Sequence, residues 1–224
     1  MARYGIKVLT KFAFLAVALG IFAMLVIRTD TLRIAALGIL AASVFLVVNF
    51  FRDPERLVPA DPGNLVVSPA DGRVVLVKDV EEPEYVGRKA VKVSIFMSPL
   101  DVHVNRFPVS GTVELVRRIP GTFIGAFHEK SSDLNERVSI GIRRSDGSRI
   151  LFTQIAGALA RRIVAEVSVG QEATVGERFG MIMFGSRVDV VMPKEAQVAV
   201  SLHDRVTAGE TVLGRMALVP QRVA

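Results

Sequence analysis

Two long apolar runs near the N-terminus constrain the fold of this chain more than any other feature. Residues 12–27 form an unbroken apolar run, and residues 34–51 form a second one that only Ser43 and Asn49 interrupt. A helix needs about 20 apolar residues to cross a bilayer, and each run reaches that length with its flanks. The short polar turn at residues 28–33 predicts a transmembrane helical hairpin with both ends on the same side. A hairpin that enters only one leaflet is the alternative.

The charges that flank these runs predict an orientation. The turn carries Arg28 and Arg33, partly offset by Asp30, whereas the two outer ends carry the bases Arg3, Lys7, Lys11, Arg52 and Arg56. Basic residues favour the cytoplasmic side of a membrane. We therefore expect a bacterial-type inner-membrane protein with the rest of the chain on the cytoplasmic side. The first run lacks a small-residue cleavage site and a second run follows at once, which disfavours a signal peptide.

Beyond the hairpin the pattern changes to that of a β domain. Turn-forming residues at 53–63 end the second run, and short runs rich in Val and Ile follow, punctuated by Gly and Pro. The expected strands are 73–77, 90–96, 111–116, 137–142, 150–155, 164–167, 187–191 and 198–202. This pattern predicts a mostly β domain, a barrel or sandwich of short strands. The predicted division is a membrane-anchoring hairpin at 1–52 and a β-rich catalytic domain at 53–224.

A weak internal repeat lies in the C-terminal part. Residues 175–180 and 208–214 each place Gly-Glu shortly before another Gly. These segments resemble the turns of biotinyl- and lipoyl-type barrels, where glycine supplies a positive φ. The repeat indicates a turn geometry and not a function.

Composition excludes several kinds of chemistry. The chain has no cysteine, so thiolate catalysis and cysteine-based metal sites are excluded, and we expect no metal. Imidazole chemistry must use one of three histidines, His103, His128 or His203. The net charge of +6 suits an anionic partner, and the hairpin favours an anionic membrane over a nucleic acid.

Four short motifs occur in a characteristic order along the β domain. They are Ser-Pro-Ala-Asp-Gly at 68–72, Asp-Val-His-Val-Asn-Arg-Phe-Pro at 101–108, Asn-Glu-Arg-Val at 135–138 and Phe-Gly-Ser-Arg-Val-Asp-Val at 184–190. Together they resemble the phosphatidylserine decarboxylase family over about residues 53–218. The resemblance is to the short form, which has Gly-Ser-Arg where other members have Gly-Ser-Thr.

The resemblance implies that the chain cleaves itself between Gly185 and Ser186. A serine hydroxyl is a weak nucleophile and needs a neighbouring base, and a carboxylate usually fixes the tautomer of a histidine base. We expect Asp71 and His103 to activate Ser186 for attack on the carbonyl of Gly185. The implied products are a large chain, 1–185, and a small chain, 186–224, in which Ser186 has become a pyruvoyl group.

The implied reaction converts phosphatidylserine in an anionic membrane into phosphatidylethanolamine. The pyruvoyl ketone would form a Schiff base with the amine and replace pyridoxal phosphate as the electron sink. His103 is also the expected proton donor, and His128 and Arg106 are candidate substrate-binding residues. Many family members carry a second histidine where this chain has Arg106, which argues against a role that needs two imidazoles there. A homo-oligomer is compatible with this prediction.

Three other interpretations stay open. A membrane-tethered, lipoyl-like barrel adaptor without enzyme activity would account for the hairpin and the Gly-Glu turns, but would leave Asp71, His103 and Ser186 unexplained. A biotin or lipoyl carrier needs an exposed lysine at a hairpin tip, and Lys194 after Met192-Pro193 is a poor match. A decarboxylase of a related amino-acid-headed substrate would keep the same chemistry.

Overall fold

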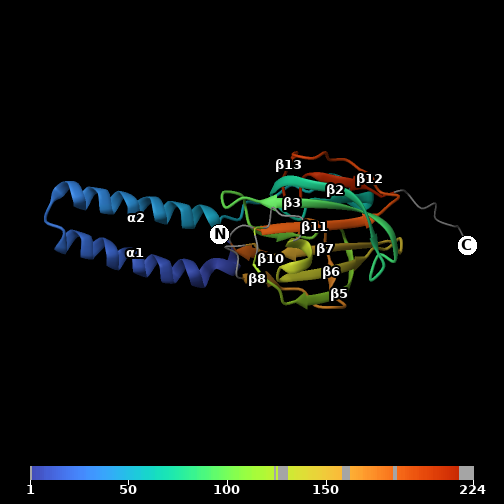
Figure 1. Ribbon diagram of the computed structural model, residues 1–224, viewed down its shortest axis with the longest axis horizontal. Coiled ribbons are helices and arrows are strands. Elements are labelled where there is room, and N and C mark those ends of the chain that lie inside the picture. The colour runs from blue at the N-terminus through green and yellow to red at the C-terminus, as the bar shows by residue number, and fades with distance from the viewer. Residues whose placement is uncertain (1, 124, 126–130, 158–161, 184–185, 217–224) are drawn as a thin grey trace, which may run out of the picture. The chain divides into compact units, whose positions relative to one another are not determined.

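The computed structural model describes residues 2–123, 125, 131–157, 162–183 and 186–216. The chain divides into two compact units, Met1–Pro54 and Glu55–Ala224. The structure confirms the predicted fold class, because two apolar helices forming a hairpin precede a mostly β unit whose largest sheet curls into a half-barrel (Figure 1).

The first unit consists of the short helix η1 (Arg3–Gly5) and the long helices α1 (Ile6–Val26) and α2 (Asp30–Phe50). Both long helices are apolar enough to cross a membrane. Large apolar side chains point outward from them, including Phe14, Leu25 and Phe45. A helix that is apolar all round suits a lipid environment. The hairpin ends are tied together by the hydrogen bond from the Ala2 amide to the Phe51 carbonyl, 2.8 Å.

The described part of the second unit is built from antiparallel strands in three sheets. The largest has the strand order β13 (Arg205–Val206), β2 (Gly72–Glu82), β3 (Arg88–Met97), β11 (Ser186–Pro193), β7 (Arg149–Ile155), β6 (Arg137–Arg143), β5 (Gly111–Ile119) and β9 (Glu172–Ala173). The two smaller sheets have the orders β4 (Val104–Arg106), β10 (Arg178–Met183), β8 (Arg162–Ala165), and β1 (Leu65–Val67), β14 (Val212–Arg215), β12 (Gln197–Val198). Two further short helices are η2 (Pro62–Asn64) and α3 (Ser131–Leu134).

Strand β11 lies at the centre of the large sheet, between β3 and β7 (Figure 1). All eight of its residues are buried. Val188 and Val190 belong to the main core, with Ile95 of β3 and Phe152 of β7. Because side chains alternate along a strand, Ser186 points to this core side, and Arg187 and Asp189 point to the opposite face.

Several strand predictions need correction. Strand β2 is about twice its predicted length and β3 is three residues longer than predicted, because they form one long hairpin around residues 83–87. The strand expected at 198–202 is limited to β12, which ends at Val198. The prediction missed β10, whose apolar side chains are buried without alternation, and β4, a strand of three residues.

Candidate active site

Ser186 is the first residue of β11 and lies opposite Met97, the last residue of β3. Its side chain is fully buried, and its Oγ donates a hydrogen bond to the Met97 Sδ at 3.3 Å. The other residue of the predicted cleavage site, Gly185, lies outside the described residues. The candidate nucleophile is therefore shielded from bulk water, and its hydroxyl contacts a thioether.

A chain of buried polar contacts links Ser186 to two of the other motifs. The Nδ2 of Asn105 lies 3.8 Å from the same Met97 sulfur and 3.3 Å from the carbonyl oxygen of Pro69. Gln154 of β7 donates to the Asn105 Oδ1 at 2.8 Å. Met97, Asn105 and Gln154 had no predicted role, and only the position of Asn105 inside the second motif could have indicated one.

The third motif, residues 135–138, is hydrogen-bonded to the residue that follows β7. Asn135 is fully buried, and its Nδ2 donates to the Ala156 carbonyl at 2.6 Å. The neighbouring Ile155 lies opposite Arg187 of β11. The fold thus brings all four motifs to the strand that begins with Ser186, although they are spread over more than 100 residues of sequence.

His103 lies just before β4, and its side chain is fully buried. Its neighbours Val102 and Val104 are buried as well. The Nδ1 of His103 lies 2.9 Å from the carbonyl oxygen of Asp101. A carbonyl only accepts hydrogen bonds, so Nδ1 carries a proton, and in the neutral form of the ring the lone pair lies on Nε2.

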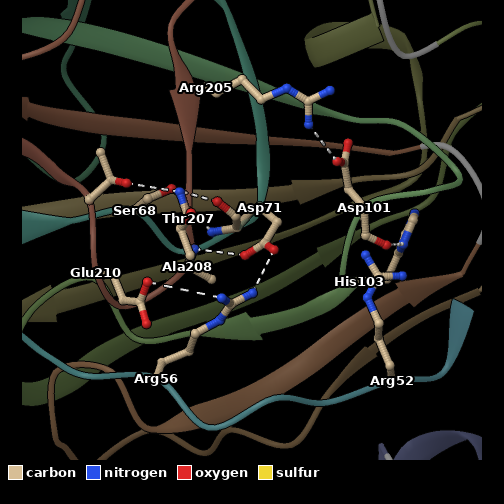
Figure 2. Close-up of polar contacts among 12 residues, drawn as sticks. Arg52, Arg56, Ser68, Asp71, Asp101, His103, Arg205, Thr207, Ala208 and Glu210 are labelled. Atoms are coloured by element: carbon tan, nitrogen blue, oxygen red, sulfur yellow. Dashed lines mark hydrogen bonds and ion pairs between the residues drawn. The ribbon is translucent and has the colours of Figure 1, made fainter. Parts of the chain in front are cut away.

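The turn that holds His103 is itself tied down. The amide of Ser98 donates to the Asp101 Oδ2 at 2.7 Å, and the amide of Asp101 donates to the Ser98 carbonyl at 2.8 Å. Arg205 of β13 donates to the Asp101 Oδ1 at 3.2 Å (Figure 2). The backbone carbonyl that fixes the tautomer of His103 is therefore held in place from both sides of the turn.

Asp71 lies in the turn before β2, and its two carboxylate oxygens have different partners. Oδ2 accepts a hydrogen bond from Arg56 at 2.7 Å, and Oδ1 accepts one from the Ala208 amide at 2.8 Å (Figure 2). Glu210 lies 4.0 Å from the same arginine. Residues 208–210 are the second Gly-Glu turn, which the sequence marked only as a turn. Its backbone N–H contact with Asp71 had no signal in the sequence.

These contacts change part of the roles that were predicted for Asp71 and His103. The tautomer of His103, which the sequence assigned to Asp71, is set by the Asp101 carbonyl instead. Through its two hydrogen bonds, Asp71 connects Arg56 and the turn at residues 208–210 to the first motif, residues 68–72. Cooperation of Asp71, His103 and Ser186 in one reaction stays a prediction.

Of the two candidate substrate-binding residues, the structure describes Arg106 and not His128. His128 lies outside the described residues. Arg106 in β4 is buried, and its Nη1 donates to the Gly176 carbonyl at 2.9 Å, inside the first Gly-Glu turn. His203 is exposed. Among the residues that the structure describes, no group of three or more metal-ligating side chains occurs.

A second Gly-Ser-Arg tripeptide shows what is particular to the one at Ser186. Ser148 lies in the hairpin turn between β6 and β7, where its Oγ donates to Asp146 at 2.6 Å. Its neighbour Arg149 is exposed and pairs with Glu114. The same three residues thus occur in a solvated turn and at the start of a buried central strand, and only the second place offers a water-excluded site.

Comparison with known proteins gives a consistent result. The family model for phosphatidylserine decarboxylase matches residues 45–214. A phosphatidylserine decarboxylase proenzyme of Symbiobacterium thermophilum is 50% identical over 182 residues, which cover 81% of this chain and 84% of that protein. Proenzymes with the same description from Chlorobium phaeovibrioides and Prosthecochloris aestuarii are 45% and 41% identical, and the alignments cover at least 95% of every chain compared.

Proposed function

The chain belongs to the phosphatidylserine decarboxylase family, and from that premise we propose that it is a precursor that cleaves itself between Gly185 and Ser186 and then decarboxylates phosphatidylserine. One observation carries the proposal. The hydroxyl of Ser186 is fully buried at the start of a central strand on which all four sequence motifs converge. The description of the relatives as proenzymes is in keeping with processing.

Self-cleavage begins with activation of the serine. His103, through the lone pair on Nε2, takes the hydroxyl proton as Oγ attacks the carbonyl carbon of Gly185. The C–N bond of the peptide breaks, the proton passes to the nitrogen of residue 186, and an ester joins Gly185 to the serine oxygen. Removal of the Cα proton of residue 186 then expels the Gly185 carboxylate and leaves dehydroalanine. Tautomerisation and addition of water release ammonia and leave the pyruvoyl group.

The described neighbours of Ser186 fit such a group. A pyruvoyl methyl is smaller than a serine side chain and apolar, and the Met97 thioether beside Oγ is an apolar neighbour. When present, the group supplies an electrophilic ketone that accepts the substrate amine and the electrons left behind by carbon dioxide. In this proposal His103 moves a proton in that later reaction, which is supported by the hydrogen bond that orients its ring, and burial of the site keeps water away.

The anchor suits a lipid substrate. Both helices α1 and α2 are long and apolar enough to cross a membrane, and their outward-facing apolar side chains need lipid contact. We propose that the hairpin holds the enzyme at the bilayer in which phosphatidylserine lies, with the β unit on the cytoplasmic side. A serine-headed relative of this lipid is the alternative substrate.

A trapping experiment tests the proposed reaction and its substrate class. The full chain in detergent is incubated with phosphatidylserine, lysophosphatidylserine or free serine, carbon dioxide is measured, and cyanoborohydride is added to reduce an amine–ketone adduct. We expect carbon dioxide from the two lipids and a lipid-sized mass increase confined to chain 186–224. Ser186→Ala should give neither signal. Carbon dioxide release by Ser186→Ala, or trapping on another segment, would overturn the proposal.

A further inference from the structure

The arginine of the cleavage motif has a side chain that the proposed chemistry does not use. Arg187 is among the largest fully buried side chains of the chain, with 1% of its surface exposed. Its Nε donates to the Asp189 Oδ1 at 2.6 Å, and its Nη2 donates to the Ser94 Oγ of β3 at 2.7 Å. A fully buried guanidinium is rare unless it is paired and hydrogen-bonded.

Asp189 connects the same network to two more elements. Ser132 of α3 donates to its Oδ2 at 2.7 Å, and the Lys92 Nζ of β3 lies 3.8 Å from that oxygen. The network therefore joins β11, β3 and α3 on the face of the sheet opposite the Ser186 side chain. Arg149 of the other Gly-Ser-Arg tripeptide shares none of this burial, since its side chain is 48% exposed.

The strand register shows where support is needed. In the described register, Ser186 lies opposite Met97 on β3, whereas pairing with β7 begins only at Arg187. Cleavage at Gly185 would make Ser186 the first residue of a new chain, and free chain ends fray unless they are tied down. Arg187 is then the first residue of that chain with neighbours on both sides and a buried side-chain anchor.

We propose that Arg187 is a positioning residue that, through Asp189 and Ser94, holds the start of β11 in register after cleavage. This inference rests on the proposed self-cleavage. In the uncut precursor the chain on both sides restrains residue 186. In the cut enzyme the arginine takes over that restraint and keeps the new ketone beside Met97. Displacement of a reacting group by about 1 Å can cost about 100-fold in rate.

The test compares Arg187→Met before and after cleavage. Hydrogen exchange of residues 187–191 is measured in two backgrounds of the full chain, the self-cleaving one and the uncut Ser186→Ala one. The kcat and KM for phosphatidylserine are measured in the self-cleaving background. We expect Arg187→Met to complete cleavage, to exchange faster at these residues only in the cut form, and to lose about 10- to 100-fold in kcat with little change in KM. Arg187→Lys keeps the charge without the forked donors and should be intermediate. Glu84→Gln, which removes an exposed ion pair with Arg117 elsewhere on the same unit, should match the wild type in both measurements.

Four outcomes would overturn the inference. Wild-type kcat in cut Arg187→Met would mean that the anchor does not position the ketone. Unchanged exchange in that cut variant would mean that the start of β11 needs no such anchor. Faster exchange in the uncut background as well, or failure of that variant to fold, would make the network a general part of the fold. Failure of the proposed function is separate, since the wild type itself would then stay uncut.

Discussion

Ser186 and Ser148 each stand between a glycine and an arginine, but their surroundings give them opposite chemistry. Ser148 donates to a neighbouring carboxylate in an exposed turn, and Ser186 donates to a buried thioether. Nucleophilic catalysis by serine needs a nearby base and exclusion of competing water. We therefore expect burial and the neighbouring motifs, and not the tripeptide, to determine where the chain is cut.

The tautomer of His103 leads to a prediction about its role. Replacement of His103 by Ala removes the proposed base, and positioned bases contribute about 10²- to 10⁴-fold. We expect the self-cleavage rate to fall by this amount, measured as the growth of the small chain after synthesis is stopped. His203→Ala changes an exposed histidine and is the matched control. Cleavage of His103→Ala at the wild-type rate would remove this residue from the mechanism.

The two partners of Asp71 allow its charge to be separated from its hydrogen bond. Asp71→Asn retains an oxygen that accepts from the Ala208 amide but removes the ion pair with Arg56. We expect slower self-cleavage, by about tenfold or more, because the first motif loses its charged anchor. Glu210→Gln, 4.0 Å from the same arginine and more exposed, should cleave normally. Self-cleavage of both variants at the wild-type rate would show that the charge of Asp71 is not needed.

At the scale of single elements, the turn into β2 depends on a glycine. Gly72 has φ of 155°, and an added Cβ would lie 2.2 Å from the carbonyl oxygen of Phe96 in β3. Such backbone conformations cost about 1–3 kcal/mol for other residues, and the clash adds to that. We expect Gly72→Ala to be clearly less stable than Gly87→Ala in denaturant unfolding. Gly87 also has a positive φ, 77°, but no described atom lies within 4 Å of the added Cβ. Equal losses of unfolding free energy in the two variants would mean that the close approach of Gly72 to Phe96 does not matter for stability.

Glu114 in β5 predicts an acid-sensitive contribution to stability. A hydrogen bond from Arg143 lowers the pKa of Glu114, and Arg149 acts in the same direction. A lowered folded-state pKa gives stability that is fully present above the unfolded value of about 4.5 and is lost as the pH falls through the folded value. We expect Glu114→Gln to cost about 0.5–1 kcal/mol at neutral pH.

Unfolding free energies measured from neutral to acidic pH test this claim. The difference between the wild type and Glu114→Gln should shrink as the pH falls below about 4.5, because protonation removes the same charge. Arg143→Gln should reduce the acid sensitivity in the same way, since it removes the main cause of the shift. A difference that is constant with pH would contradict the assignment.

At the scale of the whole molecule, the sequence predicted the local features and missed the non-local ones. Hydropathy identified α1 and α2 because membrane insertion depends on runs of adjacent residues. Runs of Val and Ile located most strands of the large sheet for a similar reason. The partners of Asp71 lie 15 residues before it and 137 residues after it, and β4 pairs with β10 across more than 70 residues. Tertiary packing sets such contacts, and one sequence carries no pairwise signal for them.

The absence of cysteine makes the membrane topology directly testable. Thr29→Cys places a single thiol in the exposed turn between α1 and α2, and Ser201→Cys places one on the β unit. If the hairpin spans the membrane with its ends in the cytoplasm, a membrane-impermeant maleimide should label Thr29→Cys in spheroplasts and Ser201→Cys only after lysis. Labelling of neither thiol before lysis would favour a hairpin confined to one leaflet.

The most direct test of self-cleavage at Ser186 is the intact mass of the purified chain, measured beside Ser186→Ala and Ser148→Ala. We predict two chains for the wild type and for Ser148→Ala, the smaller holding residues 186–224 and beginning with a ketone in place of the serine amine. Ser186→Ala should stay whole. A single uncut chain from folded wild type with decarboxylase activity, or cutting of Ser186→Ala at the same bond, would contradict the account.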